Sequence, residues 1–315
     1  MKTSGSVGER GRLLVCFDFE GSYGMPHKGE PYDLSGSASA ILDELAEHEA
    51  HAVFFVVGRM IEEHPDVVQA IAAGGHEIGL HGYEHHNLAR YDAEALALLG
   101  KNIARVGTML KDMTGTPPRS FRAPYLLWPH YYRSEIYAML RDQGFHWVSN
   151  RYVQYPVELL RPRPTTARFP YAWRAADGTP RLARNRMLTG WLNRQLVLDE
   201  TFGGSRLARL RWLLGKRDPF TRDGMTEVPV HVPLDCDLIG LPKPGDDTAR
   251  ESLDYAQAVI REAMAAPAGL TTVTFHDWIV ATGNRPALLR ATLAAAREQG
   301  AVVSTIAKSP QWLHT

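Results

Sequence analysis

The chain has 315 residues, of which 44% are hydrophobic and 22% charged, and its 35 basic and 35 acidic residues give no formal net charge. This length suffices for a large hydrophobic core, and the balanced charge excludes a protein that binds nucleic acid through a large overall positive charge. The presence of only two cysteines, Cys16 and Cys236, excludes a disulfide framework and a zinc site built from cysteines.

The N-terminal stretch MKTSGSVGERGR holds no apolar segment of the kind found in secretory signals. No apolar run in the chain approaches the ~20 residues that a membrane helix requires. We therefore expect a cytoplasmic protein.

Short β-branched or aromatic runs alternate with helical patterns along the chain. Between the predicted strands lie helical stretches such as HPDVVQAIAAGG, which has Pro65 in its first turn and Gly74 and Gly75 at its end. This alternation predicts parallel strands joined by crossover helices, as in an α/β barrel or a doubly wound sheet. The predicted strands are Leu13–Phe17, Ala52–Val57, Glu77–Leu80, Arg119–Arg122, His146–Val148, Val228–Val232, Thr271–Phe275 and Ala301–Ser304.

The alternation is interrupted between residues 151 and 225, where fourteen arginines and Lys216 outnumber six acidic residues. We interpret this basic segment as an insertion within a single domain that covers residues 1–315. Its stretch SRLARLRWLLGKR predicts a helix with leucines on one face, which we interpret as docked on the core in preference to a peripheral membrane contact. The excess positive charge favours a phosphate-bearing substrate, linked to a nucleotide or a lipid.

Two carboxylates end the first predicted strand, in the stretch LLVCFDFEGSYG. Because residues i and i+2 of a strand share a face, Asp18 and Glu20 can both point into one site. One of them can complete a metal site, and the other can act as a general base that is kept ionised by the cation and an arginine.

Histidines with metal-ligand spacing occur in HGYEHH, after the third predicted strand. His81 and His85 are four residues apart, so on a helical turn both rings would face the same way and could bind one metal ion with a carboxylate. His86 could replace His85 as a ligand. A pair with this spacing can also arise by chance in a chain with 13 histidines.

Two further motifs follow predicted strands. In FRAPY, Arg122 ends a strand, and Pro124 stiffens the turn that presents the backbone N–H of Tyr125, a candidate for stabilising an oxyanion. In TVTFHDW, His276 ends another strand and is a candidate general acid, with a packed core histidine as the alternative.

Together, FDFEG, HGYEH, FRAPY and FHDW resemble, in their order, the motifs of the polysaccharide deacetylase family, also known as the NodB-homology or carbohydrate esterase family 4 proteins. The resemblance covers about residues 12–150 and 226–315. It implies a distorted (β/α) barrel that uses a divalent metal, most simply Zn²⁺, to hydrolyse N- or O-acetyl groups. Carried over, it makes Asp18 the base and Glu20, His81 and His85 the metal ligands.

The same resemblance makes Arg122 the residue that orients Asp18, places the Tyr125 N–H in the oxyanion hole and makes His276 the acid. The chain has D-x-E where the family usually has two adjacent aspartates, so the division of roles between Asp18 and Glu20 stays open. The partner of His276 is also open, because the chain has only Asn150 where the family has an Asp-rich motif, while Asp235 and Asp237 follow later.

We therefore expect a metal-dependent deacetylase that acts on an N-acylated amino sugar, free or linked to a lipid or nucleotide, and that does not bind nucleic acid. A ring-opening hydrolase of cyclic amides or imides, as in the allantoinase-like branch, is the first alternative. A non-catalytic sugar-binding barrel is the second.

Overall fold

The computed structural model describes residues 11–25, 32–127, 132–154, 172–174, 180–182, 218–232, 234–239 and 270–314. Within these residues, no helix is long and apolar enough to cross a membrane. Most of the predicted insertion at 151–225, including the SRLARLRWLLGKR helix, lies outside the described residues.

Nine strands form one curved sheet with the order β12-β1-β2-β3-β4-β5-β10-β9, and β13 pairs with β1 beside this path. The paired strands are parallel except for the antiparallel pair β9 and β10. Parallel pairing follows from the crossover helices between successive strands. The strands are β1 (Arg12–Phe19), β2 (Val53–Val56), β3 (Glu77–Leu80), β4 (Ser120–Phe121), β5 (Trp147–Val148), β9 (Phe220–Arg222), β10 (Met225–Glu227), β12 (Leu270–His276) and β13 (Val302–Val303).

Two short strand pairs lie apart from the main sheet. They are the parallel pair β6 (Tyr152–Gln154) with β11 (Val230–Val232) and the antiparallel pair β7 (Ala172–Arg174) with β8 (Pro180–Leu182). The strand β11 contacts β12 through hydrogen bonds between backbone and side chains: the N–H of His231 donates to Thr272 Oγ1 at 2.9 Å, and the N–H of Thr272 donates to His231 Nδ1 at 3.1 Å. This contact brings a further strand against the edge of the curved sheet.

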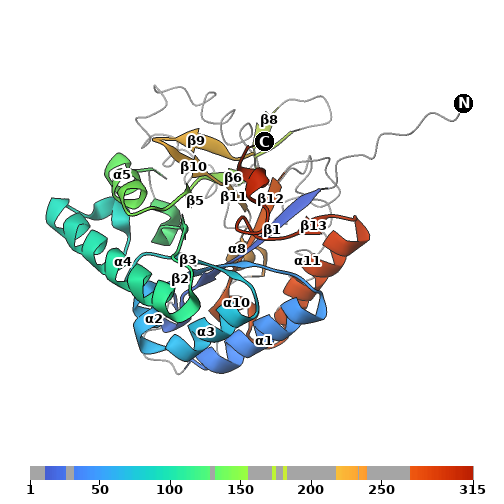
Figure 1. Cartoon of the computed structure of the whole chain (residues 1–315). Helices are drawn as coiled ribbons and strands as arrows, with labels where there is room; N and C mark the ends of the chain where they lie inside the picture. The colour runs from blue at the N-terminus through green and yellow to red at the C-terminus, as the bar shows by residue number, and fades with distance from the viewer. Residues whose placement is uncertain are drawn as a thin grey trace, which may run out of the picture.

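Helices surround the outside of the curved sheet (Figure 1). Along this outer layer, α11, α1, α3 and α4 pack against one another in that order, and α2 and α5 pack on α4. The helices are α1 (Leu34–Glu47), α2 (Gly58–Glu63), α3 (Pro65–Ala73), α4 (Ala93–Thr114), α5 (Ser134–Asp142), α8 (Asp235–Leu238), α10 (Asp277–Val280) and α11 (Pro286–Glu298).

The longest helix, α4, has sequence signals at both ends. Asp92 caps its start, because its side chain accepts a hydrogen bond from the N–H of Ala95. Gly115 ends it in the left-handed conformation, with φ 76°, which glycine adopts without a steric penalty.

The strand β1 divides the core between the two faces of the sheet. Leu13, Val15 and Phe17 lie in the large cluster shared with the helices, whereas Leu14 and Cys16 lie in a smaller cluster on the inner face. Because side chains alternate along a strand, Asp18 falls on the same inner face as Leu14 and Cys16. The alternation therefore aims a carboxylate at the inside of the barrel.

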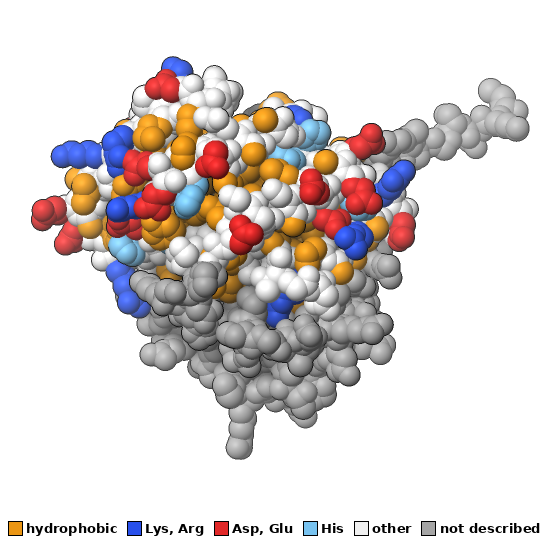
Figure 2. All heavy atoms as spheres, turned by 90° about the horizontal axis from the view of Figure 1, so that it is seen from below, with side chains coloured by type: hydrophobic (Ala, Val, Ile, Leu, Met, Phe, Trp, Pro, Cys, Tyr) orange, Lys and Arg blue, Asp and Glu red, His pale blue; other side chains and the backbone are white. Residues whose placement is uncertain are grey.

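The predicted α/β barrel architecture is confirmed. Each predicted strand overlaps a strand of the structure, and their ends differ by at most two residues. The strand β3 has the predicted bounds. The short elements β9, β10, α2 and α5 were not predicted. On the face shown in Figure 2, acidic and basic side chains are interspersed among apolar ones, without a large region of one sign.

Candidate active site

A buried cluster at the carboxyl ends of β1 and β3 brings together Glu20, His81 and His85. Glu20 Oε1 lies 3.1 Å from His81 Nε2 and 2.9 Å from His85 Nε2. All three residues are buried. Burial acts to raise the pKa of Glu20, but the positive charges of His85 and His276 and hydrogen bonds from both ring partners hold it well below its ordinary value. The carboxylate is therefore ionised.

The donor set of this cluster fits a divalent ion. His81 Nδ1 lies 2.9 Å from the backbone O of Arg122. A carbonyl oxygen only accepts, so Nδ1 carries the proton, and in the neutral tautomer the Nε2 lone pair faces the Glu20 carboxylate, as it does in a histidine that binds a metal. A cation between Nε2 and the carboxylate would then bind both. Tetrahedral zinc ligands with bonds of ~2.0–2.1 Å lie about 3.3 Å apart, close to the observed spacing.

The expected helical turn through HGYEHH is wrong. These residues form a loop in which Gly82 (φ 67°) and His85 (φ 56°) adopt the left-handed conformation. The rings of His81 and His85 nevertheless meet, with centroids 5.3 Å apart. His86 points elsewhere, since its ring contacts the hydroxyl of Tyr91 at 3.1 Å and its side chain is 60% exposed. The loop thus places the ring of His85 beside His81 and directs the ring of the adjacent His86 away from both.

Asp18 lies beside this cluster and is bound by a buried arginine. Arg122 Nη1 donates to Asp18 Oδ1 at 2.6 Å, and the guanidinium stacks 4.3 Å from the ring of Phe55. The rest of the guanidinium is fixed by Ser149, whose Oγ accepts from Nη2 at 2.9 Å and whose backbone O accepts from Nε at 3.2 Å. Arg122 is fully buried, so this ion pair has one geometry.

His276 faces Asp18 from the next strand. The two residues are register partners of β12 and β1, and His276 Nε2 lies 3.9 Å from Asp18 Oδ2. The other ring nitrogen, Nδ1, contacts Asp235 Oδ1 at 2.7 Å, and Asp235 Oδ2 accepts from the backbone N–H of His276. Burial acts to lower the pKa of His276, but the Asp235 carboxylate, with further help from Glu20 and Asp18, raises it to about 10. The imidazolium form therefore prevails at neutral pH.

Asp235 is one of the partners that the sequence left open for His276. It lies in α8, on a segment 41 residues from His276 in the chain. The side chain of Asp237 lies outside the described part of the chain. Asn150 has another role: its Oδ1 accepts from the N–H of Ala123 at 2.7 Å, which ties the end of β5 to the start of the FRAPY turn.

That turn has an unusual backbone. Tyr125, Leu126 and Leu127 all have positive φ, between 52° and 60°. The Tyr125 side chain is 56% exposed, and its ring centroid lies 4.9 Å from that of His85. Strained backbone conformations of this kind persist where surrounding contacts enforce them, and they cluster at functional sites.

The two residues that follow His276 in the chain, Asp277 and Trp278, contact Glu20. The sequence analysis gave them no role. Asp277 Oδ1 accepts from the backbone N–H of Glu20 at 2.7 Å, and Tyr32 donates its hydroxyl to Asp277 Oδ2 at 2.7 Å. The indole N–H of Trp278 donates to Glu20 Oε2 at 2.9 Å. The motif FHDW was the available signal, but its last two residues act on a strand at the other end of the chain.

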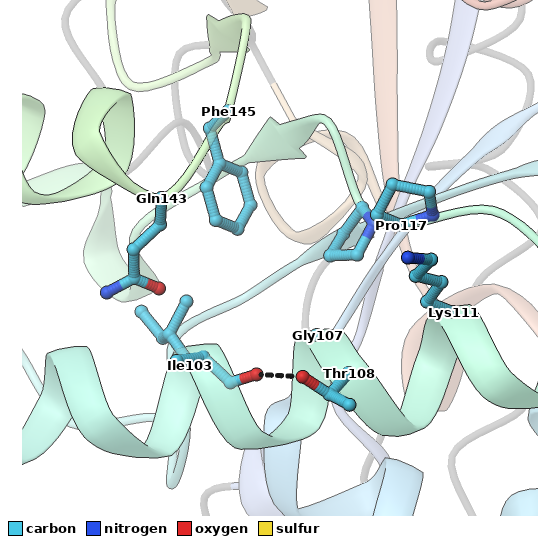
Figure 3. A pocket seen from close by; sticks show the side chains of 9 residues that line it. Ile103, Gly107, Thr108, Lys111, Pro117, Gln143 and Phe145 are labelled. Atoms are coloured by element: carbon cyan, nitrogen blue, oxygen red, sulfur yellow. Dashed lines mark hydrogen bonds between the residues drawn. The ribbon is translucent and has the colours of Figure 1, made fainter.

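A cavity of about 290 Å³ lies outside the site, against α4 (Figure 3). Ile103, Lys111, Pro117 and Phe145 are among the residues that line it, and Thr108 uses its hydroxyl to bind the backbone O of Ala104. Its lining has no acidic side chain, histidine or cysteine. The cavity therefore lacks the groups that hydrolysis requires.

Comparisons with known proteins agree with this architecture. Residues 13–148 match the family model described as polysaccharide deacetylase. The peptidoglycan-N-acetylglucosamine deacetylase of Bacillus cereus is 36% identical over 85 residues, which are 27% of this chain and 30% of that protein. The chitooligosaccharide deacetylase of Rhizobium leguminosarum bv. trifolii is 46% identical over 56 residues, or 18% of this chain and 26% of that protein. The matches thus span less than a third of these curated relatives.

A solved structure from Mycobacterium smegmatis, named as a polysaccharide deacetylase, superimposes with a TM-score of 0.59 at 18% identity. The superposition covers 99% of this chain and 92% of that one. At this identity the likeness shows the fold, and it extends beyond the segment that the family model matches. Residues 13–148 thus match the model of the polysaccharide deacetylase family, and the fold of the chain is similar to that of a solved protein named for the same activity.

Proposed function

We propose that the protein is a metal-dependent amide hydrolase that removes an acetyl or formyl group from an N-acylated amino sugar. One observation carries this proposal. The buried set of Glu20, His81 and His85 adjoins two charged side chains. These are the Asp18 carboxylate, bound by an arginine, and the His276 imidazolium, bound by an aspartate; Asp18 Oδ2 and His276 Nε2 lie 3.9 Å apart. A metal site with an acid and a base beside it matches the requirements of amide hydrolysis.

A divalent ion such as Zn²⁺, held by Glu20, His81 and His85, would polarise the scissile carbonyl and lower the pKa of a bound water from 15.7 to about 7. Asp18 is the general base of the proposal. Its Oδ1 is occupied by Arg122, so its Oδ2 is the oxygen that accepts the proton of the attacking water. Glu20 is excluded from this role because both of its oxygens have partners.

His276 is the general acid. Its Nδ1 is engaged by Asp235, which leaves Nε2 to deliver a proton to the departing nitrogen. The raised pKa, about 10, keeps that proton in place at neutral pH. An amine leaves as a neutral molecule only when it is protonated, so this donation is essential for amides. The turn that contains Pro124 presents the Tyr125 N–H, which we assign to the oxyanion by the family resemblance.

The acyl amino sugar is supported by the names of the relatives, which act on peptidoglycan N-acetylglucosamine and on chitooligosaccharides. The basic segment at 151–225 favours a phosphate-bearing form of such a sugar, linked to a nucleotide or lipid. Its residues lie mostly outside the described part of the chain, so the substrate is best chosen by experiment.

The test is a hydrolysis screen of the zinc-loaded protein against N-acetylglucosamine, its β-1,4 oligomers, UDP-N-acetylglucosamine and cyclic imides. Release of acetate from an amino sugar, lost in Asp18→Asn with its metal content retained, is the expected result. Turnover of cyclic imides alone would establish the ring-opening alternative. Sugar binding without turnover would establish a non-catalytic protein and contradict the proposal.

A further inference from the structure

The two carboxylate oxygens of Glu20 have different partners. Oε1 faces the two histidines, at 3.1 Å from His81 Nε2 and 2.9 Å from His85 Nε2. Oε2 accepts the indole N–H of Trp278 at 2.9 Å. Glu20 and Trp278 are both buried, and an indole N–H can only donate. The contact therefore fixes which oxygen faces the histidines.

Glycine at position 24 leaves room for this contact. A Cβ at Gly24 would lie 1.7 Å from Glu20 Oε2 and 2.6 Å from Trp278 Nε1. The backbone at Gly24 has φ −85°, which any residue can adopt, so the requirement for glycine here is one of space. Gly24 and Trp278 together form a closed slot around Oε2.

The main chain of Glu20 is held by the same segment. Asp277 Oδ1 accepts from the N–H of Glu20 at 2.7 Å, and Asp277 Oδ2 accepts from the N–H of Gly21 at 3.1 Å. Asp277 and Trp278 are consecutive at the start of α10. The backbone and the side chain of Glu20 are thus fixed by two neighbouring residues more than 250 positions away in the chain.

We infer that Trp278 is a positioning residue that restricts Glu20 to one-oxygen coordination of the divalent ion. The inference rests on the proposed function, which places the ion between Glu20, His81 and His85. Three single-atom ligands leave one position of a tetrahedral ion open for water or substrate. A carboxylate that turned to chelate through both oxygens would fill a further position, as it often does around larger cations such as Ca²⁺.

The inference is tested by measuring metal binding to the metal-depleted full chain, which does not depend on activity. Zn²⁺ affinity is measured by competition with a chelator, and coordination number by the visible absorption of the Co²⁺-loaded protein. In Trp278→Phe we expect about 10-fold weaker Zn²⁺ binding, the lower end of the range for lost outer partners of ligands. The Co²⁺ bands should weaken, since their intensity falls as coordination rises above four.

Trp147→Phe is the matched control. It also removes a buried indole N–H from a carboxylate, because Trp147 Nε1 donates to Glu77 Oε1 at 3.2 Å, and Glu77 is not part of the Glu20, His81 and His85 set. Both metal readouts should be unchanged in this variant. Gly24→Ala keeps the indole but places a Cβ within 1.7 Å of Oε2 and 2.6 Å of Trp278 Nε1, so it disturbs the same contact, and we expect the same two changes from it.

A folded Trp278→Phe protein with the affinity and Co²⁺ spectrum of the wild type would overturn the inference and leave the proposed function intact. If Trp278→Phe does not fold, wild-type readouts in Gly24→Ala would overturn it equally. A wild-type chain that binds neither ion would overturn the proposed function itself.

Discussion

The site is built by two regions that contribute in different ways. Residues 13–148, which match the family model, provide the metal-ligand set and the Asp18–Arg122 pair. Residues 218–314 provide His276 with Asp235, and also the two residues that hold Glu20. The first region therefore carries the groups proposed to bind metal and activate water, and the second carries the proton donor and fixes the first region's carboxylate.

The regions are joined by the pairing of β1 with β12, which runs over seven residue pairs and ends at Asp18 and His276. This parallel register places the proposed base and acid side by side at the carboxyl ends of their strands. In a barrel, this is the end where catalytic groups gather. The comparison teaches that the segment matched by the family model is incomplete as a site without the strand that follows it by more than a hundred residues.

The largest effect is expected from the first region. His81→Ala or His85→Ala should abolish stoichiometric metal binding, because each removes one of the three proposed protein ligands. Elemental analysis of protein purified without chelator measures this, and His86→Ala, with its exposed ring, is the matched control that should keep the ion. Full metal content in both variants would mean that the first region does not bind the metal ion through His81 and His85.

In the second region, His276→Ala should lower amide hydrolysis by about 10²–10⁴-fold while leaving the metal content unchanged, because it removes an acid and not a ligand. Activated aryl esters, whose leaving groups need no proton, should be spared. Steady-state kinetics on an acetamide and an aryl acetate separate these cases. An equal loss on both substrates, with a lower melting temperature, would instead assign His276 a structural role.

Asp235→Asn should move the alkaline limit of kcat/KM to lower pH. The Asp235 carboxylate is the largest contribution that raises the pKa of His276, to about 10, and the acid form is lost above that value. Removing the charge lowers the pKa, so the proton donor is lost at a lower pH. A pH–rate profile of both proteins measures the shift, and an unchanged alkaline limb would contradict this pairing.

The smallest effect concerns stability. Glu227 on β10 is buried and accepts from the N–H groups of Asn150 and Arg151 at 2.7 and 2.8 Å. Burial raises its pKa from 4.5 to about 7, so the folded protein binds the proton more tightly than the unfolded chain. Its contribution to the free energy of unfolding is therefore full below pH 4.5 and is lost as the pH rises through 7, by about 3 kcal/mol.

Glu227→Gln has no charge to bury, so its stability should fall less than that of the wild type between pH 5 and pH 8. Urea unfolding at both values measures the difference. Glu298→Gln, at an exposed glutamate near the end of α11, is the control and should follow the wild type. Parallel pH dependences for wild type and Glu227→Gln would contradict the raised pKa of Glu227.

Much of the fold could be predicted because its signals are local. The apolar runs of β1 to β3 and the caps of α3 and α4 are contained in a few consecutive residues. The short strand β10 could not be predicted, since its three residues form a strand only by pairing with β5 and β9. Residues within the loop of HGYEHH were also misjudged, because the left-handed backbone at His85 is set by its surroundings.

The sequence by itself predicted that Asp18 and Glu20 meet in one site, and their carboxylates do lie together, although Glu20 follows the last residue of β1, Phe19, and so is not placed by strand alternation. It also determined that four polar motifs follow strands, and that parallel strands bring such motifs to one edge. Only the tertiary structure decided that Asp235 binds His276 and that Trp278 binds Glu20, over separations of 41 and 258 residues. Partners so distant are chosen by the order in which strands pack, and that order depends on contacts across the whole chain.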